Sequence, residues 1–180
     1  KSQDGGVRWK PVFDEQPAPK AIFTVSAGVA HVLRLSNLPP AVPLIRVEDA
    51  GMAPQMIRYV LAVVLRVAQR IDAYAAQQRE ARWEQHPARA PSSLQVGVLG
   101  LGVIGAAIAR ALADQGFAVR GHARTARRID GVRCHAGSDG LDAFLDGLEV
   151  LVCVLPHTPE TAGILDRATL RLGDGREVDF

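Results

Sequence analysis

Cysteine is scarce in this sequence: Cys134 and Cys153 are the only two among 180 residues. Two cysteines cannot form the disulfide framework of a small secreted domain. We therefore expect both thiols to be reduced, the protein to be cytoplasmic, and Cys153 to be a buried core thiol. Cys134 and His135 are adjacent but have no further ligands beside them, so no metal site is predicted.

Long apolar runs and a charge excess are also missing. The longest apolar stretch, residues 57–67, contains Arg58 and Arg66, so it is too short and too charged to span a bilayer. The first six residues are polar and lack the apolar core of a secretory signal. The net charge of +2 gives no reason to expect nucleic acid or a membrane surface as a partner. Apolar residues make up 48%, enough for the core of one domain, or of one domain plus part of another.

The first half of the chain predicts short elements followed by one long helix. Residues 21–25 and 43–47 are short apolar runs typical of strands, and residues 30–35 suit one or two helical turns. From about residue 54 to residue 81, apolar side chains recur at spacings of three and four, which predicts an amphipathic helix. The proline-containing residues 86–91 are interpreted as a linker at a domain junction.

Strands and helices alternate in the second half. Residues 150–155 are apolar throughout, as is typical of a parallel strand covered on both faces. The alternation predicts an α/β fold with a doubly wound parallel sheet. We expect strands at 95–99, 117–121, 132–135 and 149–155, one helix at 103–115, and a second helix capped by Ser138 or Asp139 that ends at Leu145.

Three glycines follow the first of these strands and open the helix after it. Gly100 permits a tight turn, Gly102 lets a diphosphate approach the backbone, and Gly105 allows close packing of helix and strand. The helix N-terminus then offers N–H groups and a partial positive charge to the phosphates. A purely structural glycine turn is the alternative, but the flanking strands and helix favour a Rossmann-type dinucleotide site.

The end of the second strand favours NADP(H), with NAD(H) as the alternative cofactor. A site for NAD has an acidic residue about 20 residues after the glycine motif, but no carboxylate appears here before Asp130. Arg124 and either Arg127 or Arg128 can pair with a 2′-phosphate, and Thr125 can donate its hydroxyl. An ordinary solvated basic loop is the other interpretation.

A proline-containing loop follows the last strand, at the sheet edge where ligands bind in doubly wound folds. Thr158 and Thr161 either contact ribose or phosphate or cap the next turn, and the local sequence favours neither. We interpret His157 as a solvated residue rather than a catalytic one.

Together, the glycine motif and residues 155–161 resemble the D-isomer-specific 2-hydroxyacid dehydrogenases. The resemblance extends over nearly the whole chain, to about residue 175. Further similarities narrow it to the glyoxylate/hydroxypyruvate reductase A branch, and they lie at residues 9–11, 21–23, 27–29, 43–51, 55–56 and 124–125.

This resemblance implies a domain organisation and an activity. It implies part of a flavodoxin-like substrate domain over residues 1–51, a hinge and dimer helix with its linker over 52–93, and a Rossmann-type dinucleotide-binding domain over 94–180. Such enzymes are homodimers that reduce a small 2-keto acid, glyoxylate or hydroxypyruvate, to the 2-hydroxy acid with hydride from NADPH.

The resemblance also implies which residues form the binding sites. Ala30 stands where the family more often has an acidic residue. A side-chain contribution to substrate binding is therefore not expected at Ala30, whereas binding by the backbone N–H groups before it still is. The implied residues are Gly100, Gly102, Val103, Ile104 and Gly105 for the diphosphate; Arg124, Thr125 and Arg127 for the 2′-phosphate; Leu155, Pro156 and Thr161 for the adenosine and ribose side; and Trp9, Ala27, Gly28 and Val29 for the substrate.

No catalytic residue is assigned in this sequence. The family's substrate-clamping arginine, its acidic residue and its proton-donating histidine all lie downstream of the proline–threonine loop, and none is matched before Phe180. We therefore expect an internal fragment or a truncated product with little turnover, since loss of a general acid alone costs roughly 10²–10⁴-fold in rate.

Two other functions are possible for a chain with these motifs, and the missing parts of the substrate domain have one physical consequence. A non-catalytic NADP(H)-binding module is the first alternative. A β-hydroxyacid dehydrogenase is the second, but its glycine motif opens the chain, whereas residues 1–99 precede the motif here. Apolar surface on the strands of residues 1–51 is expected to be exposed, which predicts a dimer or an aggregate.

Overall fold

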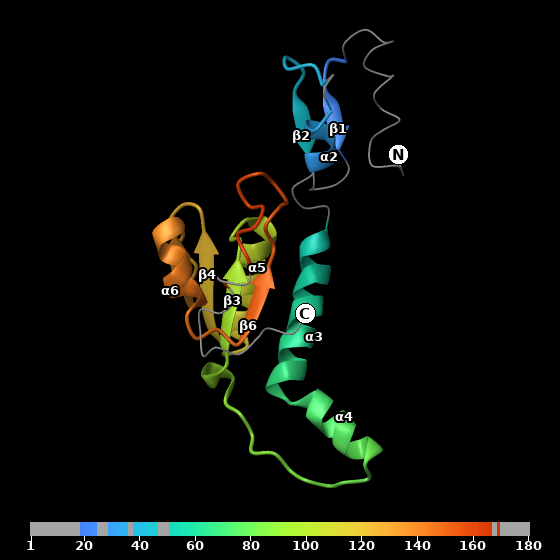
Figure 1. The fold of residues 1–180 in the computed structure, drawn as a ribbon, viewed down its shortest axis with the longest axis vertical. Helices are drawn as coiled ribbons and strands as arrows, with labels where there is room; N and C mark the ends of the chain where they lie inside the picture. Colours follow the sequence, from blue (N-terminus) through green and yellow to red (C-terminus); the bar gives the residue numbers. More distant parts are fainter. Residues whose placement is uncertain (1–18, 25–28, 36–37, 47–50, 167–168, 170–180) are drawn as a thin grey trace. The chain divides into compact units, whose positions relative to one another are not determined.

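The computed structural model describes residues 19–24, 29–35, 38–46, 51–166 and 169 (Figure 1). The chain divides into two compact units, which are described separately below. The smaller unit contains residues 1–50 and 156–162, and the larger unit contains residues 51–155 and 163–180. The expected division at residues 51 and 93 stays a prediction.

Two short parallel strands and one helical turn form the described core of the smaller unit. Strand β1 (Ile22–Thr24) pairs with strand β2 (Leu44–Arg46), and Ile22 lies opposite Leu44. Helix α2 (Ala30–Leu33) lies between them in the sequence. These are the expected elements; each strand begins one residue later than predicted, and α2 ends two residues earlier. The side chains of Phe23 and Ile45 are 72% and 44% exposed, so these strands carry the exposed apolar surface that the sequence predicts.

The larger unit is built on a four-stranded parallel sheet in the order β5-β4-β3-β6. The strand order reverses at β3, because β4 and β5 follow on one side and β6 is added on the other. This is the doubly wound arrangement, in which ligands bind at the carboxyl ends of the strands where the order reverses. The predicted α/β class is confirmed. The strands are β3 (Gln95–Leu99), β4 (Ala118–Ala123), β5 (Val132–Ala136) and β6 (Val150–Cys153).

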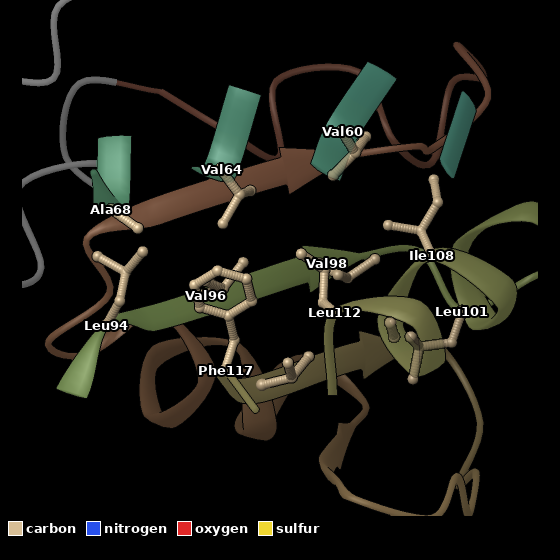
Figure 2. Close-up of a cluster of buried hydrophobic side chains, with 12 residues drawn as sticks. Val60, Val64, Ala68, Leu94, Val96, Val98, Leu101, Ile108, Leu112 and Phe117 are labelled. Carbon is tan, nitrogen blue, oxygen red and sulfur yellow. The ribbon is translucent and has the colours of Figure 1, made fainter. Parts of the chain in front are cut away.

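Helices cover both faces of this sheet. Helices α3 (Met52–Ala68) and α5 (Val103–Asp114) pack on one face, and Figure 2 shows their side chains over Val96 and Val98 of β3. Helix α6 (Leu141–Leu145) covers the other face, where Phe144 packs against Leu99. Successive residues of a strand point to opposite faces, so the continuous apolar sequence of β3 packs against the helices on both faces of the sheet.

The single helix expected between residues 54 and 81 is two helices. Helix α3 ends at Ala68, and helix α4 (Ile71–Arg79) begins after Arg70, which adopts a left-handed backbone with φ of 52°. An ion pair between Arg66 and Asp72 spans this break. The apolar spacing continues across the break, which is why periodicity alone predicts an unbroken helix. None of the described helices is both long and apolar enough to cross a membrane.

Two local predictions are wrong. Cys153 is exposed rather than buried, because it is the last residue of β6, which has a neighbouring strand on only one side in the described sheet. Neither Ser138 nor Asp139 caps α6. Both belong to a preceding 3₁₀ turn (Ser138–Gly140), in which the Ser138 hydroxyl donates to the Asp139 carboxylate at 2.9 Å.

His135 on β5 is a polar side chain on the α6 face of the sheet. Its ring centroid lies 6.2 Å from that of Phe144, and its Nε2 atom is buried without a hydrogen-bond partner among the described residues. Burial lowers the pKa of His135 below its usual value of 6.5, and the positive charges of Arg133 and Arg120 and the ring of His122 lower it further. The folded state therefore favours the neutral imidazole.

We predict that folding stability falls as the pH is lowered through about 6.5, because the unfolded chain then takes up a proton at His135 that the folded chain resists. His135→Phe removes this contribution, so its melting temperature should depend less on pH between about pH 7.5 and pH 5.5. His157→Phe, at an exposed histidine, should retain the wild-type dependence. Thermal unfolding followed by circular dichroism measures all three proteins. Identical slopes for the wild type and His135→Phe would contradict the prediction.

Candidate functional site

The turn after β3 is built from the three predicted glycines, and two of them are required by the fold itself. Gly100 has a φ of 102°, which other residues rarely adopt, and an added Cβ there would lie 3.0 Å from a Leu155 methyl group. At Gly105 an added Cβ would lie 1.8 Å from the carbonyl oxygen of Gly100. Helix α5 can start this close to β3 only because both positions lack side chains.

Gly102 is different, because nothing in the fold requires a glycine there. It is the N-cap of α5, with a φ of −72° that any residue adopts. An added Cβ would meet no atom within 4 Å. The missing side chain therefore leaves open space in front of the first turn of α5, where the sequence predicts the approach of a diphosphate.

The first turn of α5 presents backbone donors to this space. The first bond of the helix runs from the Ala106 N–H to the Gly102 carbonyl at 2.9 Å, and the N–H groups before Ala106 have no acceptor within the helix. Among the described residues, no side chain caps this end. Val103 is 54% exposed and Ile104 is half-buried. The donors and the positive end of the helix dipole together suit an anion.

Strand β4 holds the glycine turn from the side. The Gly100 N–H donates to the His122 carbonyl at 2.9 Å. The buried Leu101 packs over Gly121, where an added Cβ would lie 2.8 Å from both Leu101 methyl groups. The role of Gly121 was not predicted from the sequence, although a glycine inside a strand signals a close approach of this kind.

The predicted basic segment follows β4 directly. Arg124, Thr125, Arg127 and Arg128 are all exposed, and none of them forms an ion pair or a side-chain hydrogen bond with any residue that the structure describes. The segment leaves the sheet beside the glycine turn, because the Gly100 N–H is bonded to His122, two residues before Arg124. Guanidinium groups without a protein partner near an open helix N-terminus suit a phosphate group.

The residues predicted on the adenosine side fall in both units. Leu155 is half-buried and packs with the cluster around Phe144. Pro156 and Thr161 belong to the smaller unit, where the Thr161 hydroxyl lies 2.5 Å from the Pro156 carbonyl and accepts the Thr158 N–H at 2.9 Å. Thr161 was expected either to cap this turn or to contact the ribose or a phosphate. The structure shows the cap, and the contact with the cofactor stays a prediction. His157 is exposed, as expected.

Only one of the predicted substrate residues can be described. Val29 is half-buried, and its carbonyl accepts the N–H groups of Val32 and Leu33 at 2.9 and 3.0 Å, which starts α2. The role of Val29 in substrate binding stays a prediction, and so do those of Trp9, Ala27 and Gly28, which lie outside the described residues. Within the described ranges, no group of three or more histidine, cysteine, aspartate or glutamate residues could hold a metal ion.

His122 is the other residue at this edge that no sequence pattern indicated. Its ring is buried on the α6 face, with its centroid 5.5 Å from that of Phe144. The Nε2–H group donates to the Gly137 carbonyl at 2.8 Å. The strand carrying the basic segment is thereby bonded to the loop after β5.

Comparisons with known proteins identify the family to which this fold is similar. Residues 61–174 match the family model for the NAD-binding domain of D-isomer specific 2-hydroxyacid dehydrogenases. A glyoxylate/hydroxypyruvate reductase A from Yersinia enterocolitica is 43% identical over 173 residues, which are 92% of this chain and 55% of that protein.

Two solved structures are similar over most of the chain. A D-isomer specific 2-hydroxyacid dehydrogenase from Xanthobacter autotrophicus Py2, in complex with NADPH and MES, matches with a TM-score of 0.83 at 41% identity, over 89% of this chain and 50% of that one. An NADPH-dependent glyoxylate/hydroxypyruvate reductase from Sinorhizobium meliloti, in complex with NADP and sulfate, matches with a TM-score of 0.83 at 37% identity, over 91% and 51%. The chain thus spans about half the length of these relatives.

Proposed function

The chain belongs to the D-isomer specific 2-hydroxyacid dehydrogenase family, and we propose that it binds NADPH at the turn after β3, with NADH as the weaker cofactor. We propose further that the whole protein reduces a small 2-keto acid, glyoxylate or hydroxypyruvate, to the 2-hydroxy acid. The two cysteines, which are not in a disulfide, suit the reducing cytoplasm in which we place it.

The observation that carries this proposal is the open space at Gly102. The fold requires glycine at positions 100 and 105 but not at 102, where the missing side chain leaves room for a bound ligand. The space faces backbone donors at the N-terminus of α5, which suits a diphosphate.

The basic segment supports NADPH over NADH. The two cofactors differ by the 2′-phosphate, and Arg124, Thr125 and Arg127 offer two charges and a hydroxyl without a described protein partner. The related X. autotrophicus and S. meliloti enzymes were crystallised with NADPH and with NADP, which agrees with this choice.

Bound NADPH would supply the hydride, and this chain's residues would hold and orient it. The amides of Val103, Ile104 and Gly105 would bind the diphosphate, and Leu155 lies against the turn from the β6 side. Pro156 and Thr161 are assigned to the adenosine and ribose by the resemblance alone, and Ala27, Gly28 and Val29 to the substrate carboxylate in the same way.

Gly102→Ala should raise the Kd for NADPH by at least about tenfold, because the added methyl group occupies the space of the diphosphate. It should lower the melting temperature by no more than about 3 °C, the cost of a weaker N-cap. Gly105→Ala, whose Cβ would overlap the Gly100 carbonyl, should lower it far more. NADPH fluorescence titration and thermal unfolding measure the two effects. Unchanged NADPH affinity in Gly102→Ala would contradict the proposed site.

Arg124→Gln should weaken NADPH binding by about 10- to 100-fold, the loss expected for charge-assisted hydrogen bonds to a phosphate. The Kd for NADH should stay within about twofold, since NADH has no 2′-phosphate. Arg110→Gln, which removes the same charge from α5 at a position paired with Asp130, is the matched control. An equal loss for both cofactors would argue against a 2′-phosphate site.

Turnover by the 180-residue chain should be slow or absent even where NADPH binds. The resemblance assigns substrate clamping and proton donation to an arginine, an acidic residue and a histidine. None of the 180 residues matches these three. Their loss costs at least roughly 10²–10⁴-fold in rate. Disappearance of NADPH absorbance in the presence of glyoxylate measures this, and a rate typical of the family would refute it. Binding without turnover would also suit the alternative, a non-catalytic NADP(H)-binding module.

The family resemblance further supports a homodimer, and α3 offers a surface for it. Tyr59, Val63 and Val67 are 66%, 41% and 45% exposed, and their spacing of four residues places them on one apolar stripe. Sedimentation velocity should return a dimer for the wild type and a monomer for Val63→Asp. The substitution should leave the helical circular dichroism unchanged, because the side chain lies on the exposed face. A monomeric wild type would contradict the proposal.

A further inference from the structure

His122 connects three segments at the carboxyl end of β4. Its backbone carbonyl accepts the Gly100 N–H at 2.9 Å, and its imidazole Nε2–H donates to the Gly137 carbonyl at 2.8 Å. The Gly137 N–H in turn donates to the Ala123 carbonyl at 3.2 Å. The glycine turn, the end of β4 and the loop after β5 are therefore joined at one residue.

The side-chain bond of His122 is partly shielded from water. The residue is 7% exposed, and its ring lies against Phe144, which is fully buried. A buried hydrogen bond is costly to lose when one partner stays behind without a replacement. Removing the Nε2–H donor while keeping the shape of the ring would therefore remove the side-chain bond between the end of β4 and the loop after β5, and would leave the backbone bond from the Gly137 N–H to the Ala123 carbonyl in place.

The basic segment after β4 depends on such anchors for its direction. The side chains of Arg124, Thr125 and Arg127 make no hydrogen bond to a described residue that would orient them. The segment is fixed at its far end by Ile129, which packs against the α3 and α5 cluster and accepts the Val132 N–H at 3.1 Å. Its near end is fixed through His122 and Ala123, immediately before Arg124.

We propose that His122 is a positioning residue that determines the preference for NADP(H) over NAD(H). Its imidazole fixes the start of the basic segment beside the glycine turn, so that the arginines converge on a 2′-phosphate. This inference rests on the proposed NADPH site. The backbone bond from Gly100 to His122 does not depend on the imidazole, so replacing the side chain affects the 2′-phosphate end and leaves the diphosphate site intact.

The test compares two substitutions at His122 with one on the neighbouring strand, all in the 180-residue chain. His122→Phe keeps the ring and removes the donor, whereas His122→Gln keeps an N–H group that can reach the Gly137 carbonyl. His135→Phe is the matched control, because His135 is the partner of His122 in the strand register and also contacts Phe144, but has no bond to the loop. Fluorescence titration gives the Kd for NADPH and for NADH.

His122→Phe should raise the Kd for NADPH by about five- to tenfold, the range of one lost hydrogen bond, and change the Kd for NADH by less than about twofold. His122→Gln should restore the wild-type ratio of the two constants, and His135→Phe should leave it unchanged. A purely structural role would weaken both cofactors together, and the glutamine would not rescue the ratio.

Each other outcome has a definite meaning. If the wild type prefers NADPH and His122→Phe keeps the same ratio, the positioning role is refuted and the proposed NADPH site stands. If the wild type binds neither cofactor, the proposed site fails and this inference fails with it. If circular dichroism shows that His122→Phe is unfolded, His122→Met replaces it, because methionine is of similar size and has no donor. The ratio of the Kd values for NADPH and NADH then tests the proposal in the same way.

Discussion

The close approach of α5 to the end of β3 is the constraint on which the rest of the site depends. The Gly100 carbonyl lies where a side chain on Gly105 would begin, so the helix starts almost on top of the strand. Its first amides then lie at the carboxyl edge of the sheet, where the strand order reverses between β3 and β6. Anion binding at this edge follows from the helix terminus, and the opening at Gly102 makes it accessible.

The elements that local sequence determines were predicted well. Strand β3 has the expected bounds and α5 ends one residue earlier than expected, because glycine, apolar periodicity and β-branched runs act over a few residues. The break at Arg70 could not be predicted in this way. A left-handed backbone at an arginine has no signal in the sequence, and the apolar stripe of α3 continues into α4.

Features that depend on distant contacts were not predicted. An apolar strand sequence does not show whether a strand has neighbouring strands on both sides. Cys153 is exposed because it ends β6, which has a neighbour on one side in the described sheet. The packing of Leu101 over Gly121 and the bond from His122 to Gly137 both join segments that only the folded sheet brings together. The separate roles of the three glycines were predicted from the motif, and the structure agrees that the fold requires glycine at positions 100 and 105.

The arginines in and after β4 and β5 show why position, and not charge alone, identifies the candidate phosphate site. Arg120 donates to the Asp146 carbonyl just after the end of α6, so its charge is used within the fold at the negative end of a helix. Arg133 on β5 has no ion-pair partner among the described residues, yet it is an ordinary exposed side chain. Arg124 and Arg127 share that lack of a partner, but they follow a strand bonded to the glycine turn. A dinucleotide whose diphosphate lies at the helix amides would bring its 2′-phosphate to the side of the sheet where these arginines follow β4, whereas the described residues form no such site beside Arg133.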